Sequence, residues 1–373
     1  MLSSRGTLDR HVDLLLGILA FPARAVSLSL DEWDLVVRAA RGARLLGVVR
    51  ARLERAHLLD SVPTPVRAHL DGAWNLAAHR RQMVLHEMHA VAKVLAPLNV
   101  PLILLKGAAY IAQGLGCAEG RLPEDLDLMV PRERLDEAER ALVLAGWAFE
   151  KTDPYDEHYY RVWSHELPPM RAPGHAIELD VHHMILPPTG RVRPDTRAMV
   201  AATVAVSGSR YRVLSPADQV LHACAHLFQD SDCTGRLRDL VDIDSLLREH
   251  GTADGFWTTL LARTSLHGLG RSLSYAVRYG SAWLGTPVPS DVAPEIARFG
   301  PGPIGRGAMD RLVGLALFPT APDQEPTPST AFGRWLLFAR SMWLRMPPWL
   351  LAYHSLAKLV RGALLRRRAV AED

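Results

Sequence analysis

The first 97 residues carry apolar positions spaced three and four residues apart, which is the spacing of one face of an α-helix. Leucine, alanine, arginine and glutamate, which are good helix formers, fill many of the remaining positions. Pro63 and Pro65 interrupt the pattern. We therefore predict an N-terminal helical region over residues 1–97. Its helices are expected over 8–19, 31–53 and 65–95.

After Asn99 the pattern changes to short apolar runs that alternate with helical stretches. Runs of this length suit buried strands and are too short for helices. Strands are predicted over 100–105, 126–130, 147–151, 159–166, 176–184 and near 210–214. Helices are predicted over 108–114 and 132–145, and a Pro/Gly-rich turn over 168–174 joins two of the strands. Strands interleaved with helices indicate an α/β unit, which we place at 98–214.

From Ser215 the chain returns to a helical pattern. Ser215 is a capping residue, and Pro216 follows it at the first helical position. Helices are expected over 217–229, 235–250, 256–265 and 269–284. Proline-rich connectors follow over 287–303 and 319–328. These features define a C-terminal helical domain over 215–330 and leave 331–373 as a tail.

The tail combines basic and aromatic residues. Between residues 332 and 373, eight lysines and arginines stand against two acids, and Trp335, Trp343 and Trp349 lie among them. A basic amphipathic segment can lie on an anionic membrane surface or bind an acidic partner, and 332–368 is the candidate for such docking. The alternative is a pair of helices packed on the core, with its arginines in solvent.

The composition is typical of a globular protein. Hydrophobic residues make up 48% of the chain and charged residues 22%, which excludes a disordered or collagen-like chain. The net charge of +3 is too close to balance for a dedicated nucleic-acid binder. Three cysteines without a CxxC spacing argue against a disulfide framework and a cysteine-based zinc site. The N-terminus is a poor signal peptide, and no apolar run is long enough to cross a bilayer. We expect a cytoplasmic protein without a transmembrane span.

Two carboxylates mark the start of one predicted strand. Asp125 and Asp127 lie on the same face, because side chains alternate along a strand, and Leu126 points to the other face. Like charges this close resist ionisation, and a hard divalent cation such as Mg²⁺ removes the penalty by taking oxygen ligands. The alternative is a solvated loop that happens to carry two acids.

Two further features favour a site. Glu178, Asp180 and His182 share one face of another predicted strand, whose opposite face is apolar. Lys106 and Gly107 stand where a strand passes into a helix, so that close backbone approach and the N–H groups of the helix N-terminus are available to a phosphate. These are the parts of phosphoryl or nucleotidyl transfer, in which metals held by carboxylates clamp the attacking and leaving oxygens. A third acid can take the proton of the attacking hydroxyl.

At this point the chain resembles a known family, the uncharacterised nucleotidyltransferases of the DNA polymerase beta-like superfamily. The resemblance covers about residues 80–250. It is carried by LLKGAAY (104–110), GRLPEDLDLMV (120–130), ELDVH (178–182), LSPADQVLHACAH (214–226) and RLRDLVD (236–242).

The resemblance implies an α+β fold: a nucleotidyltransferase-type mixed β-sheet with flanking helices, preceded and followed by helical regions. It implies that Asp125 and Asp127 are metal ligands and that Asp180 is the third carboxylate. It also places Gly107 at the phosphate turn and Arg121 beside the nucleotide phosphates.

Several residues in this set have more than one interpretation. Lys106 either neutralises phosphate charge or caps a sheet edge in solvent. Arg121 pairs either with phosphate or with Asp125. His182 orients Asp180, binds metal or is a buried imidazole whose hydrogen bonds are satisfied.

Three further groups carry the same ambiguity. A histidine pair at i and i+4 either binds metal or faces the core. Two acids one helical turn apart either meet a base or sugar hydroxyl, or are solvated or paired with a neighbouring arginine. An aromatic cluster either stacks on a nucleobase or packs within a strand. These groups are His222 with His226, Asp239 with Asp242, and Tyr159 with Tyr160 and Trp163.

The leading hypothesis is a nucleotidyltransferase that depends on Mg²⁺ or Mn²⁺. It would transfer NMP from an NTP to a hydroxyl-type acceptor and release pyrophosphate, with Asp125, Asp127 and Asp180 holding the metals and Lys106, Gly107 and Arg121 binding the nucleotide. The acceptor is a small molecule, a saccharide, a protein or an RNA. The alternative is a catalytically inactive binding module that docks through its basic C-terminal end. A hydrolase that uses the same metals is a third hypothesis.

Overall fold

The computed structural model describes residues 9–149, 154–320 and 324–358. The fold is α+β with a mixed sheet and flanking helices, as expected. The sheet has seven strands in the order β3-β4-β5-β2-β1-β7-β6. The strands are β1 (Leu102–Leu104), β2 (Asp125–Met129), β3 (Ala148–Phe149), β4 (Met170–Arg171), β5 (Glu178–His182), β6 (Val204–Ala205) and β7 (Tyr211–Val213).

The centre of the sheet is formed by β5, β2, β1 and β7. Strand β2 runs parallel to β5 and antiparallel to β1, and β1 runs parallel to β7. All residues of β1 are buried, which explains why this strand reads as a continuous apolar run. Strand β2 is buried except for partly exposed Asp125 at its start. The central strands therefore form a rigid base for side chains at the start of β2.

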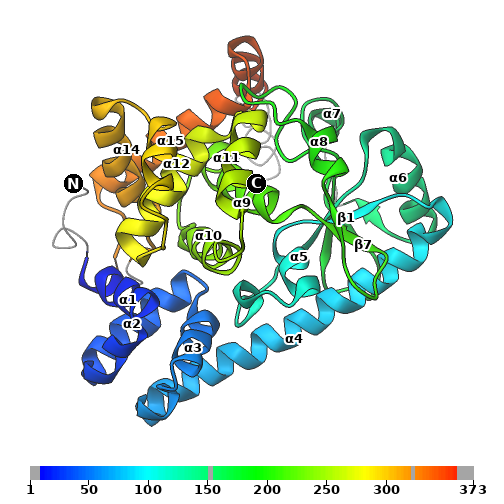
Figure 1. The fold of residues 1–373 in the computed structure, drawn as a ribbon. Helices are drawn as coiled ribbons and strands as arrows, with labels where there is room; N and C mark the ends of the chain where they lie inside the picture. The colour runs from blue at the N-terminus through cyan, green and yellow to red at the C-terminus, as the bar shows by residue number, and fades with distance from the viewer. Residues whose placement is uncertain (1–8, 150–153, 321–323, 359–373) are drawn as a thin grey trace, which may run out of the picture.

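The N-terminal region supplies four helices and supports the sheet. They are α1 (Arg10–Ala20), α2 (Leu30–Gly42), α3 (Leu46–Arg55) and α4 (Thr64–Leu95). Helix α4 extends from α3 to the sheet, where it contacts β2 and α6 (Leu135–Leu144), as Figure 1 shows. The long helix thus connects the N-terminal helices to the sheet.

The single helix predicted over 31–53 is wrong. Helix α2 ends at Gly42, and Arg44 adopts a left-handed backbone with φ of 59° before α3 begins at Leu46. Both helices are amphipathic, so the apolar spacing continues across the break and conceals it. The start of α2 follows the expected chemistry, because Ser29 and Glu32 form a reciprocal capping box.

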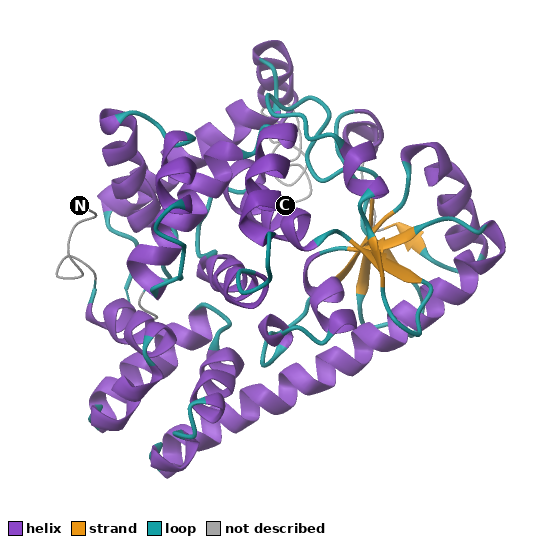
Figure 2. Cartoon of the chain, in the orientation of Figure 1, coloured by secondary structure: helices purple, strands orange, loops and turns teal. Residues whose placement is uncertain are grey.

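The part of the chain after β7 is helical and lies on the other side of α5 (Lys106–Gln113) from the sheet (Figure 2). The helices predicted from 217 to 284 are present, but two of them end in a π-helical turn, at His226–Asp230 and Gly280–Leu284. A short helix also interrupts the connector predicted over 287–303. The helices are α9 (Pro216–Ala225), α10 (Leu237–His250), α11 (Phe256–His267), α12 (Gly270–Tyr279), α13 (Val292–Arg298), α14 (Pro303–Ala316) and α15 (Pro328–Arg345), followed by a helix over 348–358.

The segment before β5 departs most from expectation. The strand predicted over 159–166 is instead the end of helix α7 (Pro154–Val162), followed by one β-bridge between Glu166 and His182. The turn predicted over 168–174 contains β4, which pairs with β3 and β5. After β5, helix α8 (Thr196–Ala201) was also not predicted. In the strand predicted over 147–151, β3 accounts for Ala148 and Phe149, and 150–151 lie outside the described residues.

The aromatic residues explain why α7 was misread as a strand. Aromatic side chains favour strands, but here their rings pack against the helix formed by 348–358. The ring of Trp163 lies 6.0 Å from that of Tyr353, and the ring of Tyr159 lies 5.4 Å from that of His354. The prediction that this cluster packs within a strand is therefore wrong, because its rings contact the helix at 348–358 instead.

The C-terminal segment packs on the helical half through its arginines. Arg340 donates to the carbonyl oxygen of Phe228 at 2.8 Å, and Arg345 lies 3.7 Å from Asp230. The expectation of fully solvated arginines is wrong for these two, whereas Trp335 and Trp349 are more than half exposed. Docking through 332–368 stays a prediction, and 359–368 lie outside the described residues. Within the described ranges, no helix combines the length and apolar character needed to cross a bilayer.

One continuous core joins these parts. Buried apolar side chains extend from Val12 in α1 through Leu126 in β2 to Leu337 in α15. The division of the chain at 97, 214 and 330 stays a prediction.

Candidate active site

A cavity of about 230 Å³ lies between the sheet and helices α9 and α10. Its wall on the sheet side carries Asp125, Asp127 and Asp180, and Lys106 and Arg121 also line it. All the proposed site residues that have side chains beyond Cα thus meet at one cavity, although they are spread over 75 positions of the chain from Lys106 to Asp180. Gly107 lies next to this wall in the first turn of α5.

The three carboxylates are brought together by strand register. Strand β2 pairs in parallel with β5 so that Asp127 stands opposite Asp180, and Asp125 stands opposite Glu178. Because alternate side chains share a face, Asp125 also lies on the face of Asp127, while Leu126 is fully buried on the other side. The acids therefore belong to a strand, and the alternative of a solvated loop is wrong.

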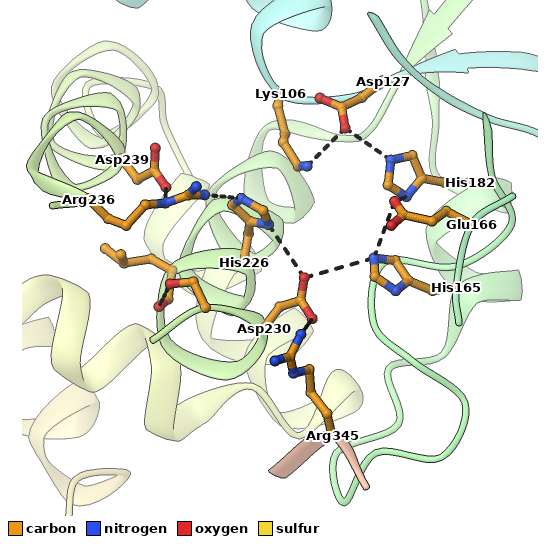
Figure 3. Close-up of polar contacts among 12 residues, drawn as sticks. Lys106, Asp127, His165, Glu166, His182, His226, Asp230, Arg236, Asp239 and Arg345 are labelled. Carbon is orange, nitrogen blue, oxygen red and sulfur yellow. Dashed lines mark hydrogen bonds and ion pairs between the residues drawn. The ribbon is translucent and has the colours of Figure 1, made fainter. Parts of the chain in front are cut away.

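One oxygen of Asp127 accepts from two nitrogen groups. Lys106 Nζ and His182 Nε2 each lie 2.9 Å from Asp127 Oδ1, as Figure 3 shows. Lys106 adopts a left-handed φ of 43°, which is unfavourable for a residue with a side chain and is held by the junction of β1 and α5. His182 thus contacts Asp127, whereas one expectation was that it orients Asp180. Lys106 points into the cavity wall and does not cap a sheet edge.

These contacts divide the ionisation of the three acids. Burial alone would raise the pKa of Asp127, but the Lys106 charge and the His182 hydrogen bond lower it well below its usual value. The negative charge of Asp127, together with burial, raises the pKa of Asp125. Burial and the charge of Asp127 raise the pKa of Asp180 to about 8. The surroundings thus favour the ionised form of Asp127 and, without a metal ion, the protonated forms of Asp125 and Asp180.

Arg121 pairs with a residue other than Asp125. Its Nε donates to Asp242 Oδ2 of α10 at 2.9 Å, and both side chains are buried. Burial would lower the pKa of Arg121, but the charge of Asp242 outweighs it and raises that pKa. Pairing with Asp125 is therefore wrong for this structure. A Cβ atom at Gly107 would overlap with the Arg121 guanidinium, so glycine leaves the space that this ion pair fills.

Comparison with known proteins agrees with this arrangement. Residues 29–285 match the family described as uncharacterised nucleotidyltransferases, so the match covers more than half of the chain. The chain belongs to this family. No curated protein and no solved structure matches it. The family match contains the sheet, α9 and α10, and therefore every cavity residue named above.

In this nucleotidyltransferase family member, the helical wall of the cavity has its own polar groups. Asp239 pairs with Arg236 at 2.7 Å, as one of the alternatives predicted, and Asp242 pairs with Arg121. His226 contacts Arg236 and faces Asp230 at 3.8 Å. His226, which follows the last residue of α9, therefore lies among charged residues of the cavity wall.

His222 is buried, and its role as a core residue fits the structure. Burial, with smaller contributions from the charges of Lys106 and His182, lowers the pKa of His222 well below its usual value. The same effect of burial lowers the pKa of His226. Both imidazoles are thus kept neutral in the folded protein at neutral pH.

The sequence argument missed two acids and a histidine of the cavity. His165 and Glu166 were placed inside a predicted strand, and Asp230 lies at the end of a predicted helix, so no spacing singled them out. For His165 and Glu166 the signal was an imidazole beside a carboxylate shortly before ELDVH, but only the bridge between Glu166 and His182 aligns them with β5. All three line the cavity.

The carboxylate set suits a hard divalent cation. Asp180 Oδ1 is buried and has no hydrogen-bond partner among the described residues, which is costly for a carboxylate unless a cation or a proton approaches it. Oxygen atoms of Asp125, Asp127 and Asp180 are the ligands that Mg²⁺ and Mn²⁺ take in proteins. The residues present therefore fit the metal that nucleotidyltransferases use.

Proposed function

We propose that this protein is a metal-dependent nucleotidyltransferase that transfers NMP from an NTP to a hydroxyl-type acceptor and releases pyrophosphate. The observation that carries the proposal is the register of β2 and β5, which sets Asp127 opposite Asp180 and leaves Asp125 on the same face. The cavity thus holds three carboxylates that can bind divalent metal ions and a lysine that can bind phosphate, which are the groups this chemistry requires.

Each residue of the set has a distinct part. Asp125, Asp127 and Asp180 would hold Mg²⁺ or Mn²⁺, which neutralises phosphate charge and polarises the reacting phosphoryl group. Lys106 would exchange its contact with Asp127 for a phosphate oxygen of the bound NTP. The N–H groups in the first turn of α5, at Gly107, would face the same phosphates.

The proton of the acceptor hydroxyl needs a destination. We assign it to a carboxylate oxygen of Asp180, which stands opposite Asp127, lines the cavity and has a buried Oδ1 without a hydrogen-bond partner among the described residues. As the acceptor oxygen forms its bond to the α-phosphorus, the bond to the bridging oxygen breaks and pyrophosphate leaves. Arg121 would support this geometry, because its ion pair with Asp242 joins helix α10 to the loop before β2.

The acceptor is the open part of the proposal. The helical wall, with Asp230 and Asp239, would face it across the cavity, and the candidate classes are a small molecule, a saccharide, a protein and an RNA.

A cytoplasmic location fits the thiols, since Cys117, Cys224 and Cys233 are all buried and free.

The test uses the full chain, each labelled NTP, Mg²⁺ or Mn²⁺, and a lysate of the source cell. We expect metal-dependent NTP binding, measured as thermal stabilisation, and transfer of label to one class of acceptor. Asp127→Asn and Asp180→Asn should remove transfer. Glu178→Gln is the matched control, because Glu178 lies on the same face of β5 but pairs with Arg171 and does not line the cavity.

The possible outcomes separate the competing functions. Absence of metal-dependent NTP binding by the wild type, or an Asp127→Asn variant that transfers label normally, would contradict the proposal and favour a binding module. Turnover of NTP without any labelled acceptor would indicate the hydrolase.

A further inference from the structure

Two histidines and a glutamate gather next to the carboxylate set, and two of the three, His165 and Glu166, line the cavity. They are His165, Glu166 and His182, and one potential ligand atom from each lies within 4.8 Å of the others. The closest approaches are 3.3 Å between His182 Nδ1 and Glu166 Oε2, and 3.9 Å between His165 Nε2 and that same oxygen. Figure 3 shows the three side chains pointing toward one another.

Backbone pairing fixes this group. Glu166 forms a bridge opposite His182 in antiparallel register, and the N–H of His183 donates to the carbonyl oxygen of His165 at 2.9 Å. Leu167 N–H donates to Val181 on the other side of the bridge. The cluster thus depends on a main-chain framework and not on a mobile surface loop.

His182 has the orientation of a metal-binding imidazole. Its Nε2 bonds to Asp127 Oδ1, while its Nδ1 is buried and receives no hydrogen bond from the described residues. Histidines that bind metals usually direct the second ring nitrogen to a carboxylate, which fixes the ring and the tautomer. With Nε2–H donating its hydrogen bond to Asp127, loss of the Nδ1 proton to an incoming metal would leave an electron pair directed toward Glu166 and His165.

The spacing and chemistry of the group suit a transition metal. Nitrogen and oxygen ligands lie about 2.0–2.2 Å from Zn²⁺, so tetrahedral ligand atoms lie about 3.4 Å apart. The separations of 3.3 and 3.9 Å bracket that value. Two imidazoles and one carboxylate favour Zn²⁺ and similar ions, whereas Mg²⁺ prefers oxygen ligands alone.

We propose that His165, Glu166 and His182 form a second metal site, which binds a Zn²⁺-class ion separately from the carboxylate set. Three protein ligands would leave one coordination position open. Asp230, which lines the same cavity, lies close to the group, with its Oδ2 4.0 Å from His165 Nε2. An ion there would hold a water or an acceptor oxygen. The proposal does not depend on nucleotidyl transfer, because the three ligands are present whatever the protein catalyses.

The test is metal binding by the full chain without nucleotide. After chelator treatment, Co²⁺ should bind at one equivalent and give the visible d–d absorption of a low-coordinate site with nitrogen ligands, and Zn²⁺ should displace it. Glu166→Gln and His165→Gln should each weaken Zn²⁺ binding at least tenfold in competition with a chromophoric chelator. Thermal unfolding of each variant checks that it is folded.

Two controls separate this site from its surroundings. Asp125→Asn should abolish metal-dependent NTP binding while it leaves the Co²⁺ spectrum unchanged, so failure of the proposed function and failure of this inference are distinguishable. His226→Gln alters a histidine of the same cavity outside the group and should also retain the spectrum. Absence of the Co²⁺ band in the wild type, or full retention of Zn²⁺ affinity by folded Glu166→Gln, would overturn the inference.

Discussion

Arg121 and Asp242 form a buried ion pair that joins the loop before β2 to helix α10, with 2.9 Å between Nε and Oδ2. The two residues lie 121 positions apart, and the side chains are only 9% and 7% exposed. The contact therefore holds the helical wall of the cavity against the sheet. It also occupies the space beside Gly107, so one ion pair connects the first turn of α5 with the C-terminal helices.

Loss of one partner of this pair should be strongly destabilising. Asp242→Asn leaves the Arg121 charge buried and uncompensated, and we expect the free energy of unfolding to fall by about 3–5 kcal/mol, measured by urea denaturation. The control is Glu119→Gln, which breaks the exposed pair with Arg55. That change should cost less than about 1 kcal/mol. Equal losses in the two variants would contradict a special role for the buried pair.

Gly107 should not tolerate even one added methyl group. Gly107→Ala places a Cβ atom against the Arg121 guanidinium, which cannot move away without breaking its contact with Asp242. We expect a loss of about 1–3 kcal/mol in thermal or urea unfolding. Gly72→Ala in α4 is the matched control, because nothing lies within 4 Å of the new Cβ atom and a helix gains about 0.5–1 kcal/mol from the change. A Gly107→Ala protein as stable as the wild type would refute the steric argument.

Lys106 should affect metal and nucleotide binding in opposite directions. Its ammonium group contacts Asp127, so it competes with any cation that approaches that oxygen. Lys106→Gln should therefore raise the affinity for Mn²⁺ alone by roughly tenfold. The reason is that the repulsion between two nearby like charges in a protein costs several kcal/mol before solvent screening reduces it. The affinity for NTP should fall. Electron paramagnetic resonance measures the first, and fluorescence titration the second.

The control for this experiment is Lys93→Gln, on the exposed face of α4. It removes the same charge from the chain and should leave both affinities unchanged. A Lys106→Gln variant in which Mn²⁺ and NTP affinity fall together would show that the lysine does not oppose the metal.

Buried His222 should make the fold sensitive to mild acid. Its pKa in the folded protein is well below the unfolded value of about 6.5, so the unfolded chain binds a proton that the folded protein resists. The contribution of His222 is complete above about pH 6.5 and is lost as the pH falls below that value. His222→Gln should therefore reduce the fall in unfolding free energy between pH 7 and pH 5 by about 1 kcal/mol or more.

Urea denaturation at the two pH values measures the difference. His79→Gln, at an exposed position of α4, is the matched control, because it removes a histidine outside the core. If both histidine variants behave alike, burial of His222 is not the cause of the acid sensitivity.

Local pattern was sufficient wherever one element decides the outcome. The alternation of Asp125, Leu126 and Asp127 placed two acids on one face of a strand, and the same rule applied to Glu178, Asp180 and His182. Helix starts were also local, as the capping serine before α9 shows. Aromatic content misled the prediction for 159–166, because strand preference depends on what the rings pack against.

The sequence by itself therefore determined which candidate residues share a face of a strand or stand at the start of a helix. These residues are three acids, a lysine and a glycine, and their motifs resemble a known family. Only the tertiary structure decided their partners. Arg121 meets Asp242 across 121 residues, and His182 meets Asp127 across 55. The physical reason is that periodicity follows from neighbours along the chain, whereas ion pairs and ligand clusters form between segments whose positions depend on the packing of the whole core.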